Sequence, residues 1–381
     1  MPVDFTQIPS PCYVLDDALL RRNLEIIKQV RDNAKVEIIL ALKGFAMWSV
    51  FPVIKEYGFN YATASSYNEA RLAFEEMGTP AHTYCPAFSK KQFLDIAKLS
   101  SHITFNSLSQ FQQFKAEVTS LRNKISFGLR VNPEFSEVKT ALYNPCAPGT
   151  RLGVLASQIG KSLPEGVEGL HFHALCESNS FDLEKTLAAF EKNFGHLLNN
   201  LKWVNMGGGH LITRKGYDTN HLVQLLNGFK NRYPHLQVIL EPGAVFAWET
   251  GYLVSSVLDI VENCGIKTAM LDVSFTAHMP DCLEMPYKPI ILSSSEEEKG
   301  KYIYRMGGNS CLSGDYMGNW SFNHELQIGE KIVFNDMIHY TMVKTSTFNG
   351  IEHPSIGTWN DKTGFRLIRE FGYNDYKNRL S

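Results

Sequence analysis

The sequence VEIILALK at positions 36–43 is a mostly apolar run that predicts a buried strand ending in a single lysine. A lysine presented to a pocket at a strand end is a common amine nucleophile, because desolvation disfavours the ammonium form and lowers the pKa. Taken alone, Lys43 is more often a solvated or ion-paired side chain. The rest of the chain has to decide between these interpretations.

Further short apolar runs follow this strand, and amphipathic stretches alternate with them up to about residue 245. We expect strands at 36–42, 61–64, 82–85, 103–106, 126–132, 169–174, 203–206 and 238–240, with helices at 67–77, 90–99, 181–198 and 220–232. Eight strands in about 210 residues match the repeat number and the size of a (β/α)8 barrel. An open doubly wound sheet is the alternative, which we disfavour because no G-x-G-x-x-G turn follows an early strand.

The pattern changes after Gly243. Runs at 252–261, 268–273, 302–305 and 331–335 are rich in β-formers and are separated by turn residues. Another short strand at 12–15 precedes a long helix expected at 17–31. The economical interpretation is an α/β protein in which a (β/α)8 barrel, residues 22–245, is inserted into a β-sandwich domain built from residues 1–21 and 246–381.

Composition excludes several classes of function. The 381 residues are 44% hydrophobic and 20% charged, which allows a sizeable core. A formal net charge of -2 and a pI near 6.6 provide no basic face for nucleic acid. An odd number of cysteines without C-x-x-C spacing suits reduced thiols, and no signal peptide or membrane-spanning run is evident. We therefore expect a cytoplasmic protein with neither nucleic acid nor a membrane as partner.

Polar and glycine-rich segments lie at the expected C-terminal ends of barrel strands, where barrel active sites form. Lys43 follows the first strand, His173 lies at the sixth, Gly207-Gly208-Gly209 follow the seventh and Glu241-Pro242-Gly243 follow the eighth. The glycines let backbone amides approach a phosphate, although an isolated GGG is more often only a tight turn. Glu241 can keep a pyridine nitrogen protonated, or can be an ordinary buried ion pair. The His173 ring can stack on a planar cofactor, or can be a hydrogen-bonded interior histidine.

The HxH pattern at His171 and His173 also permits a zinc site, with His210 as the nearest extra ligand. Barrel hydrolases that use an HxH place it on the first strand and add histidines and an aspartate on later strands. Here the first strand offers Lys43 and the last offers Glu241. We therefore expect no metal.

Longer motifs resemble the alanine-racemase-fold, pyridoxal-phosphate-dependent decarboxylases, which include ornithine, diaminopimelate and arginine decarboxylases. The motifs are LALKGF, LRVNPE, RLGV, HFHAL, MGGG, LEPG, GGNSCLSGDYM and HYTMVKTSTFNG, and they extend over nearly the whole chain. Within this group, LALKGF, GNSCLSGD and TAHMPD at 276–281 resemble the bacterial carboxynorspermidine (carboxyspermidine) decarboxylases. The resemblance implies a lyase of polyamine biosynthesis that forms norspermidine or spermidine and uses pyridoxal 5'-phosphate as its cofactor.

The resemblance also implies roles for single residues. Lys43 would hold the cofactor as a Schiff base, His173 would stack on its ring, and Glu241 would pair with its pyridine nitrogen. The cofactor phosphate would be bound by the glycine turns at Gly208, Gly209 and Gly243 and by the hydroxyl group of Tyr340.

Two further implied roles concern the departing carboxylate and the second subunit. Cys311 would reach in from the partner subunit as the proton donor, and Phe348 would pack near the carboxylate that leaves. The family therefore implies a head-to-tail homodimer with shared active sites.

The chain departs from the family pattern at two positions. Ala244 stands where many relatives have an arginine that holds the phosphate, and Leu312 stands where many have an acid that binds the distal amine. Substrate binding then moves to other polar residues, for which we choose Asp281, Asp315 and His278, with Asp272 and Glu177 as weaker candidates. Diaminopimelate, ornithine or arginine decarboxylation, an amino-acid racemase and a non-catalytic regulatory relative remain as alternatives.

Overall fold

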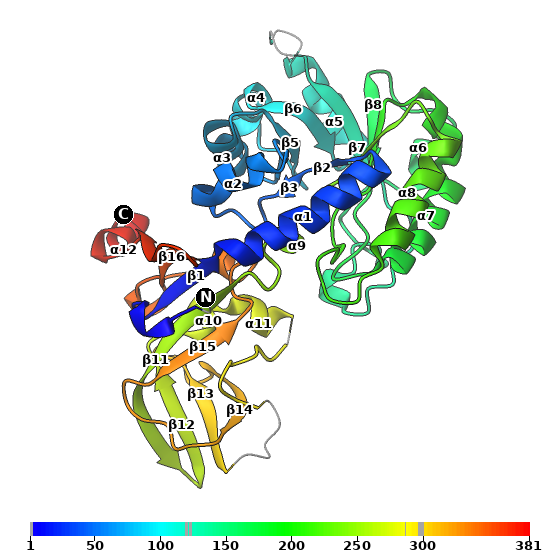
Figure 1. Cartoon of the computed structure of the whole chain (residues 1–381). Coiled ribbons are helices and arrows are strands. Elements are labelled where there is room, and N and C mark those ends of the chain that lie inside the picture. Colours follow the sequence, from blue (N-terminus) through cyan, green and yellow to red (C-terminus); the bar gives the residue numbers. More distant parts are fainter. Residues whose placement is uncertain (1–2, 119–120, 122–123, 286, 296–300) are drawn as a thin grey trace. The chain divides into compact units, whose positions relative to one another are not determined.

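The computed structural model describes residues 3–118, 121, 124–285, 287–295 and 301–381. The chain divides into two compact units (Figure 1). One unit, Asn23–Phe246, is called the barrel unit below. The other, Met1–Arg22 with Ala247–Ser381, is called the sheet unit.

All strands of the barrel unit are parallel, and their order follows the order of the chain. They are β2 Glu37–Ile38, β3 Leu40–Ala41, β4 Ala62–Ala64, β5 Ala81–Tyr84, β6 Ser100–Phe105, β7 Ser126–Arg130, β8 Val167–His171, β9 Trp203–Asn205 and β10 Gln237–Leu240. Because β2 and β3 are two halves of the run that starts at residue 36, nine short strands correspond to eight barrel positions.

The barrel closes through this first run. The Ile39 N–H donates to the Leu240 carbonyl at 2.9 Å, on the side of the last strand. The Leu40 and Leu42 N–H groups donate to Tyr61 and Thr63 at 3.1 Å, on the side of the next strand. One segment therefore bonds to both neighbours, which confirms the predicted barrel and rules out the open doubly wound sheet.

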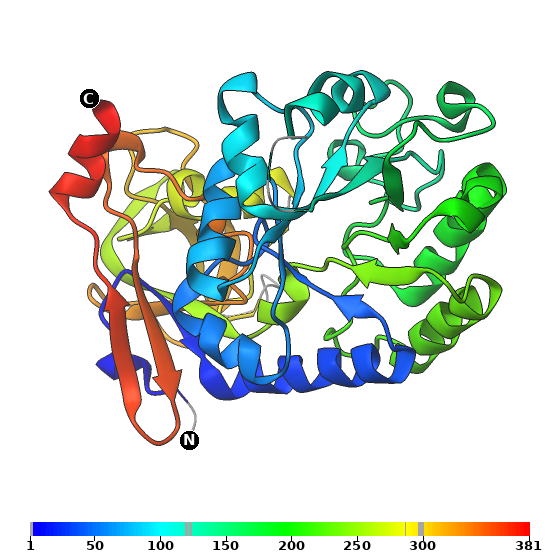
Figure 2. The ribbon, with the colours of Figure 1, turned by 90° about the horizontal axis from the view of Figure 1, so that it is seen from above.

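Helices form an outer ring around these strands (Figure 2). Side-chain caps at the starts of these helices include Asp16, Ser66, Ser107, Asn179 and Asp218. The helices in chain order are α1 Asp17–Ala34, α2 Phe51–Glu56, α3 Tyr67–Leu72, α4 Lys90–Lys98, α5 Leu108–Lys115, α6 Ala156–Ile159, α7 Ser180–Phe194, α8 Thr219–Arg232 and α9 Ala244–Ala247. The predicted helix at 67–77 ends its α-helical part at Leu72 and continues as a π-helical turn.

Trp203 fills part of the barrel interior, and glycines on two neighbouring strands make room for it. A Cβ atom at Gly169 would lie 2.0 Å from the Trp203 ring, and one at Gly128 would lie 2.3 Å from it. The indole N–H donates to Ser126 Oγ at 2.9 Å, so its polar atom is satisfied. Small residues on β7 and β8 are thus a packing requirement of the barrel.

The sheet unit contains one connected mixed sheet of eight strands. Its long strand β11 pairs with β1 and β15 near its start and with β12 towards its end. The strands are β1 Cys12–Asp16, β11 Gly251–Asn263, β12 Ile266–Leu271, β13 Tyr302–Gly307, β14 Tyr316–Phe322, β15 Lys331–Asn335, β16 Ser355–Asn360 and β17 Gly364–Arg369, and the helices are α10 Phe275–His278, α11 Pro280–Glu284 and α12 Tyr373–Leu380. The N-terminal strand therefore belongs to this sheet, as predicted.

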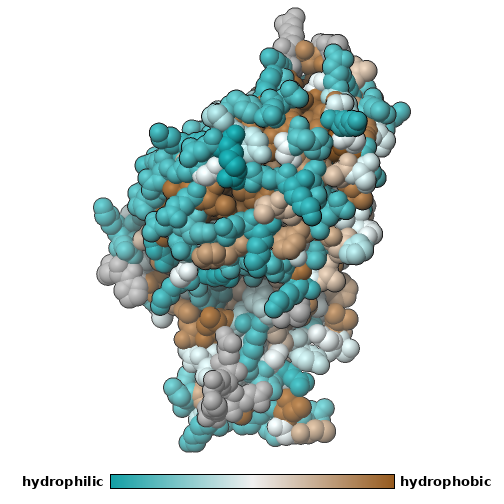
Figure 3. Space-filling model, turned by 90° about the vertical axis from the view of Figure 1, so that its right-hand side faces the viewer, coloured by the Kyte–Doolittle hydropathy of each residue, from teal (hydrophilic) through white to brown (hydrophobic). Residues whose placement is uncertain are grey.

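The surface shown in Figure 3 is largely hydrophilic, with smaller hydrophobic areas scattered between the polar side chains. Among the described residues, no helix has both the length and the apolar composition that crossing a membrane would require.

Candidate active site

Glu241 follows β10, and side chains of three other strands hold its carboxylate. Its Oε1 atom lies 3.0 Å from His171 Nε2. Its Oε2 atom accepts hydrogen bonds of 2.8 Å from Thr63 Oγ1 and from Asn205 Nδ2. Burial alone would raise the pKa of Glu241, but the interaction with His171 and the hydrogen bonds outweigh it and lower the pKa to about 2. The group is a fixed anion at the end of the barrel.

Lys43 lies in the turn that directly follows β3. Solvent reaches its side chain, yet protein atoms surround the amine closely enough that desolvation lowers its pKa. Glu241 opposes this shift in pKa, and Arg130 adds to it. The turn packs backbone to backbone on the segment after β10, because a Cβ at Gly44 would lie 3.0 Å from Gly243 Cα. Gly44 and Gly243 therefore permit the close approach of Lys43 to the segment that carries Glu241.

His173 lies beyond the end of β8, which stops at His171 instead of reaching residue 174 as expected. Its Nδ1 atom accepts the Gly208 N–H at 3.0 Å, so a neutral ring carries its proton on Nε2. Burial, followed by the charges of Lys43 and Arg130, lowers the pKa of this imidazole. His173 is thus a neutral, half-buried ring attached to the glycine turn.

The glycine turn itself leaves no room for side chains. Gly207 and Gly209 have positive φ angles of 72° and 89°. A Cβ at Gly208 would lie 2.4 Å from the Glu241 carbonyl oxygen. The turn is therefore a bare backbone surface beside Glu241 and His173, of the kind that an anionic group can approach.

Arg130, at the end of β7, is a buried cation of the same strand-end cluster. Its guanidinium lies over the Tyr84 ring at 4.8 Å and donates to the His173 carbonyl at 3.1 Å. The LRVNPE motif contains this residue, but the sequence assigned it no role.

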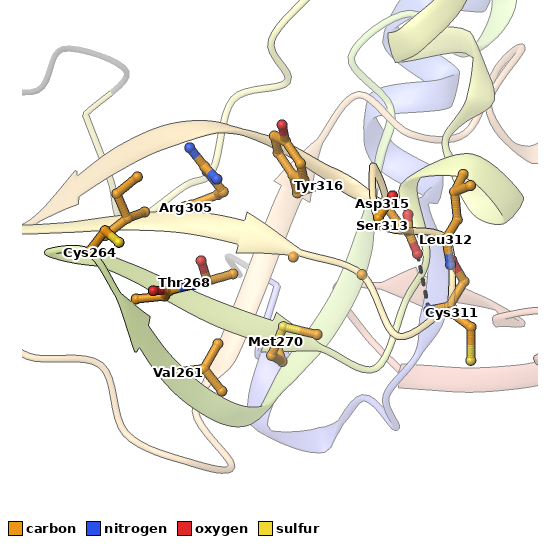
Figure 4. Close-up of a pocket in the computed structure, with 15 residues that line it drawn as sticks. Val261, Cys264, Thr268, Met270, Arg305, Cys311, Leu312, Ser313, Asp315 and Tyr316 are labelled. Atoms are coloured by element: carbon orange, nitrogen blue, oxygen red, sulfur yellow. Dashed lines mark hydrogen bonds between the residues drawn. The ribbon is translucent and has the colours of Figure 1, made fainter.

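In the sheet unit, Cys311 lies on an exposed loop between β13 and β14. The loop borders a hollow of about 490 Å³, which has Cys311 and Leu312 at one end and Cys264 and Arg305 at the other (Figure 4). The Cys311 N–H donates to Asn349 Oδ1 at 2.8 Å, which attaches the loop to the segment that also carries the exposed Phe348. The structure thus brings the Cys311 and Phe348 motifs together.

Asp315 is buried and bonded within the protein. One carboxylate oxygen accepts the Thr276 N–H at 3.2 Å, and the other accepts the Ser310 N–H at 3.1 Å. It therefore joins the TAHMPD segment to the Cys311 loop. These two hydrogen bonds are enough to give Asp315 a structural role.

Asp281 and His278, the other two candidates for substrate binding, are also buried. Asp281 pairs with the Lys344 ammonium at 2.6 Å, and the same ammonium lies 2.6 Å from Glu284 and 5.6 Å from the centre of the Tyr340 ring. His278 Nδ1 accepts the Ser274 N–H at 3.2 Å, and burial lowers the pKa of His278 to about 4. Tyr340 is half-buried in this unit.

Comparison with known proteins agrees with this geometry. Residues 12–338 match the family model described as "Pyridoxal-dependent decarboxylase, C-terminal sheet domain". Carboxyaminopropylagmatine decarboxylase of Synechocystis sp. is 49% identical over 98% of this chain and 96% of its own length. The chain belongs to the pyridoxal-dependent decarboxylases.

Two further relatives narrow the group. Carboxynorspermidine/carboxyspermidine decarboxylase of Campylobacter jejuni is 44% identical over 98% of this chain and 99% of its own. A crystal structure of carboxynorspermidine decarboxylase from Campylobacter jejuni, complexed with norspermidine, superimposes with a TM-score of 0.90 at 42% identity, covering 98% of this chain and 100% of that one. The predicted family, the decarboxylase activity and the cofactor are confirmed, and the non-catalytic interpretation is wrong.

The residues of the barrel unit fit pyridoxal phosphate. They provide a lysine of lowered pKa, an ionised carboxylate, a neutral imidazole and a glycine turn without side chains. In the described part of the chain, no three His, Cys, Asp or Glu side chains are grouped so as to hold a metal ion.

Sequence reasoning missed the residues that surround Glu241. Thr63 and Asn205 are each the next-to-last residue of an expected strand, and that placement was the only available signal. The structure also gives His171 a partner other than a metal, since its Nε2 faces the carboxylate.

Proposed function

We propose that this decarboxylase removes the carboxylate from carboxynorspermidine and carboxyspermidine and releases norspermidine and spermidine. The observation that carries the proposal is the likeness to the Campylobacter jejuni enzyme, which covers 98% of this chain and 100% of that one. That structure holds norspermidine, the product that decarboxylation of carboxynorspermidine would give.

A second substrate is favoured by the 49% identity to the Synechocystis enzyme. Carboxyaminopropylagmatine has the same carboxylated aminopropyl end as the other two compounds, but its distal group is a guanidinium instead of an ammonium. A pocket can distinguish these groups only through contacts at the distal end.

The barrel residues would share the chemistry at the carboxylated end. Pyridoxal phosphate, when bound, supplies a ring that accepts the electron pair left by departing carbon dioxide. The Lys43 amine would attach the cofactor covalently, which its lowered pKa favours. Glu241 would pair with the pyridine nitrogen, and the His173 ring would stack on the cofactor. The phosphate would be bound by Gly208, Gly209, Gly243 and Tyr340.

The sheet-unit residues would bind the rest of the substrate. Phe348 would provide an apolar surface near the carboxylate, which loses hydration there. Asp281, Asp315 and His278 would lie towards the distal amines. Because Asp281 already pairs with Lys344, a substrate ammonium would have to share or replace that partner.

A mass-spectrometric panel tests the substrate. The purified holoenzyme is incubated with carboxynorspermidine, carboxyspermidine, carboxyaminopropylagmatine, meso-diaminopimelate, ornithine and arginine. We expect the first two to be consumed fastest. Preference for the agmatine derivative would establish the second candidate, and turnover of only a simple diamino acid would overturn both.

We further propose a cytoplasmic head-to-tail homodimer in which Cys311 of one subunit donates a proton in the barrel of the other. The support is the exposure of the Cys311 loop in a family that uses a thiol as a general acid. Mixing Lys43→Ala with Cys311→Ala protein tests this arrangement. With shared sites, half of the dimers regain one intact site, so about a quarter of the wild-type activity returns. No regain after subunit exchange would contradict sharing.

A further inference from the structure

We propose that His171 is a positioning residue that holds Glu241 as an anion for the cofactor ring nitrogen. The inference rests on the proposed pairing of Glu241 with that nitrogen. Three side chains from three different strands converge on one carboxylate, and His171 is the only titratable group among these three.

The orientation of the Asn205 amide is fixed by a second contact. Its Oδ1 atom accepts the Gly207 N–H at 2.8 Å. The Nδ2 group must therefore face Glu241 Oε2, where it can only donate. The NH2 group cannot accept a proton from Oε2, and Thr63 Oγ1 could accept it only by giving up its own hydrogen bond to Oε2, so protonation of that oxygen is unfavourable.

His171 blocks protonation of the other oxygen. If Oε1 carried a proton, His171 would have to present an unprotonated Nε2 and carry its own proton on Nδ1. Nδ1 is buried and has no hydrogen-bond partner among the described residues. An N–H placed there would be unsatisfied, which costs about 1–3 kcal/mol.

His171 itself stays neutral in this arrangement. It is 2% exposed, and burial lowers its pKa although the charge of Glu241 opposes the shift. The pair therefore keeps a full negative charge. Because Asn205 also binds the glycine turn, the carboxylate and the turn proposed to hold the phosphate are connected through one side chain.

The test compares the binding of two cofactors to the cofactor-free protein by equilibrium dialysis. One is pyridoxal phosphate, and the other is its 1-deaza analogue, which has a carbon in place of the ring nitrogen. We expect the wild type to prefer pyridoxal phosphate and His171→Leu to lose about tenfold or more of that preference. His171→Gln keeps a neutral N–H donor and should retain most of it.

His102→Gln is the matched control, because His102 is another barrel histidine but bonds to Ser101. If His171 had only a structural role, its replacement would weaken the binding of both cofactors equally. The ratio of their affinities would then stay unchanged, which would overturn the inference. The inference would also be overturned if folded His171→Leu protein kept the wild-type ratio of affinities while Glu241→Gln lost its preference for pyridoxal phosphate. If Glu241→Gln also keeps the wild-type ratio, the proposed pairing of Glu241 with the ring nitrogen fails instead.

Discussion

The barrel unit and the sheet unit hold their candidate site residues in different ways. Glu241 is buried at a strand end and is fixed by side chains from three other strands or strand ends. Cys311, Leu312 and Phe348 are exposed, and the Cys311 backbone N–H donates to Asn349 in the Phe348 segment. The difference teaches that the candidate cofactor residue Glu241 is held on a rigid scaffold, whereas the exposed candidates of the sheet unit lie on segments that tolerate change.

The largest expected difference between the units is in activity. Lys43→Ala should lower kcat by about 10³-fold or more, because it removes the amine nucleophile. Leu312→Ala, on the sheet-unit loop, should change KM by less than about tenfold, since one exposed side chain is shortened. Steady-state kinetics with the preferred substrate measure both, and unchanged unfolding midpoints are the control. Complete loss of activity in Leu312→Ala would contradict the expected difference between the two units.

The second expected difference is in stability. Gly169→Ala should lower the free energy of unfolding by about 3 kcal/mol, because its Cβ would lie 2.0 Å from the Trp203 ring inside the packed barrel. Gly314→Ala, on the Cys311 loop, has no atom within 4 Å of its added Cβ and should be nearly neutral. Urea unfolding midpoints measure both variants. Equal midpoints would show that the barrel interior can rearrange around Trp203.

The sequence predicts the barrel well because buried parallel strands are short continuous apolar runs, and residues 36–42 illustrate this. It misses β14, β16 and β17, whose sequences YMGNWSF, SIGTWN and GFRLIR mix polar, glycine and charged residues. These strands are defined by pairing with neighbours and not by local pattern.

The candidate site shows the same limit. Lys43 and Glu241 stand out because each ends an apolar run. The contacts of Thr63 and Asn205 with Glu241 join residues 178 and 36 positions apart, and only the closed barrel brings them together. Nothing in the sequence indicated a partner for the Asp281 carboxylate, whereas in the structure it forms an ion pair with Lys344.

The smallest expected difference between the units is in acid stability, and it concerns one buried histidine in each unit. Burial lowers the pKa of His82 in the barrel to about 3 and that of His278 in the sheet unit to about 4. The unfolded state takes up a proton near pH 6.5, so stability is highest above that pH and falls as the pH drops towards the folded-state pKa. Each extra proton bound by the unfolded state costs about 1.4 kcal/mol per pH unit.

Replacing either histidine with glutamine should flatten this decline. Between pH 6.5 and about 4 the two variants should gain alike relative to wild type, and below about 4 only His82→Gln should continue to gain, because only His82 still resists protonation. Urea midpoints at pH 7, 5 and 3.5 measure the difference. If both variants kept the wild-type pH slope, the two imidazoles would be reachable by protons without unfolding, and the barrel interior would be no more rigid than the loops of the sheet unit.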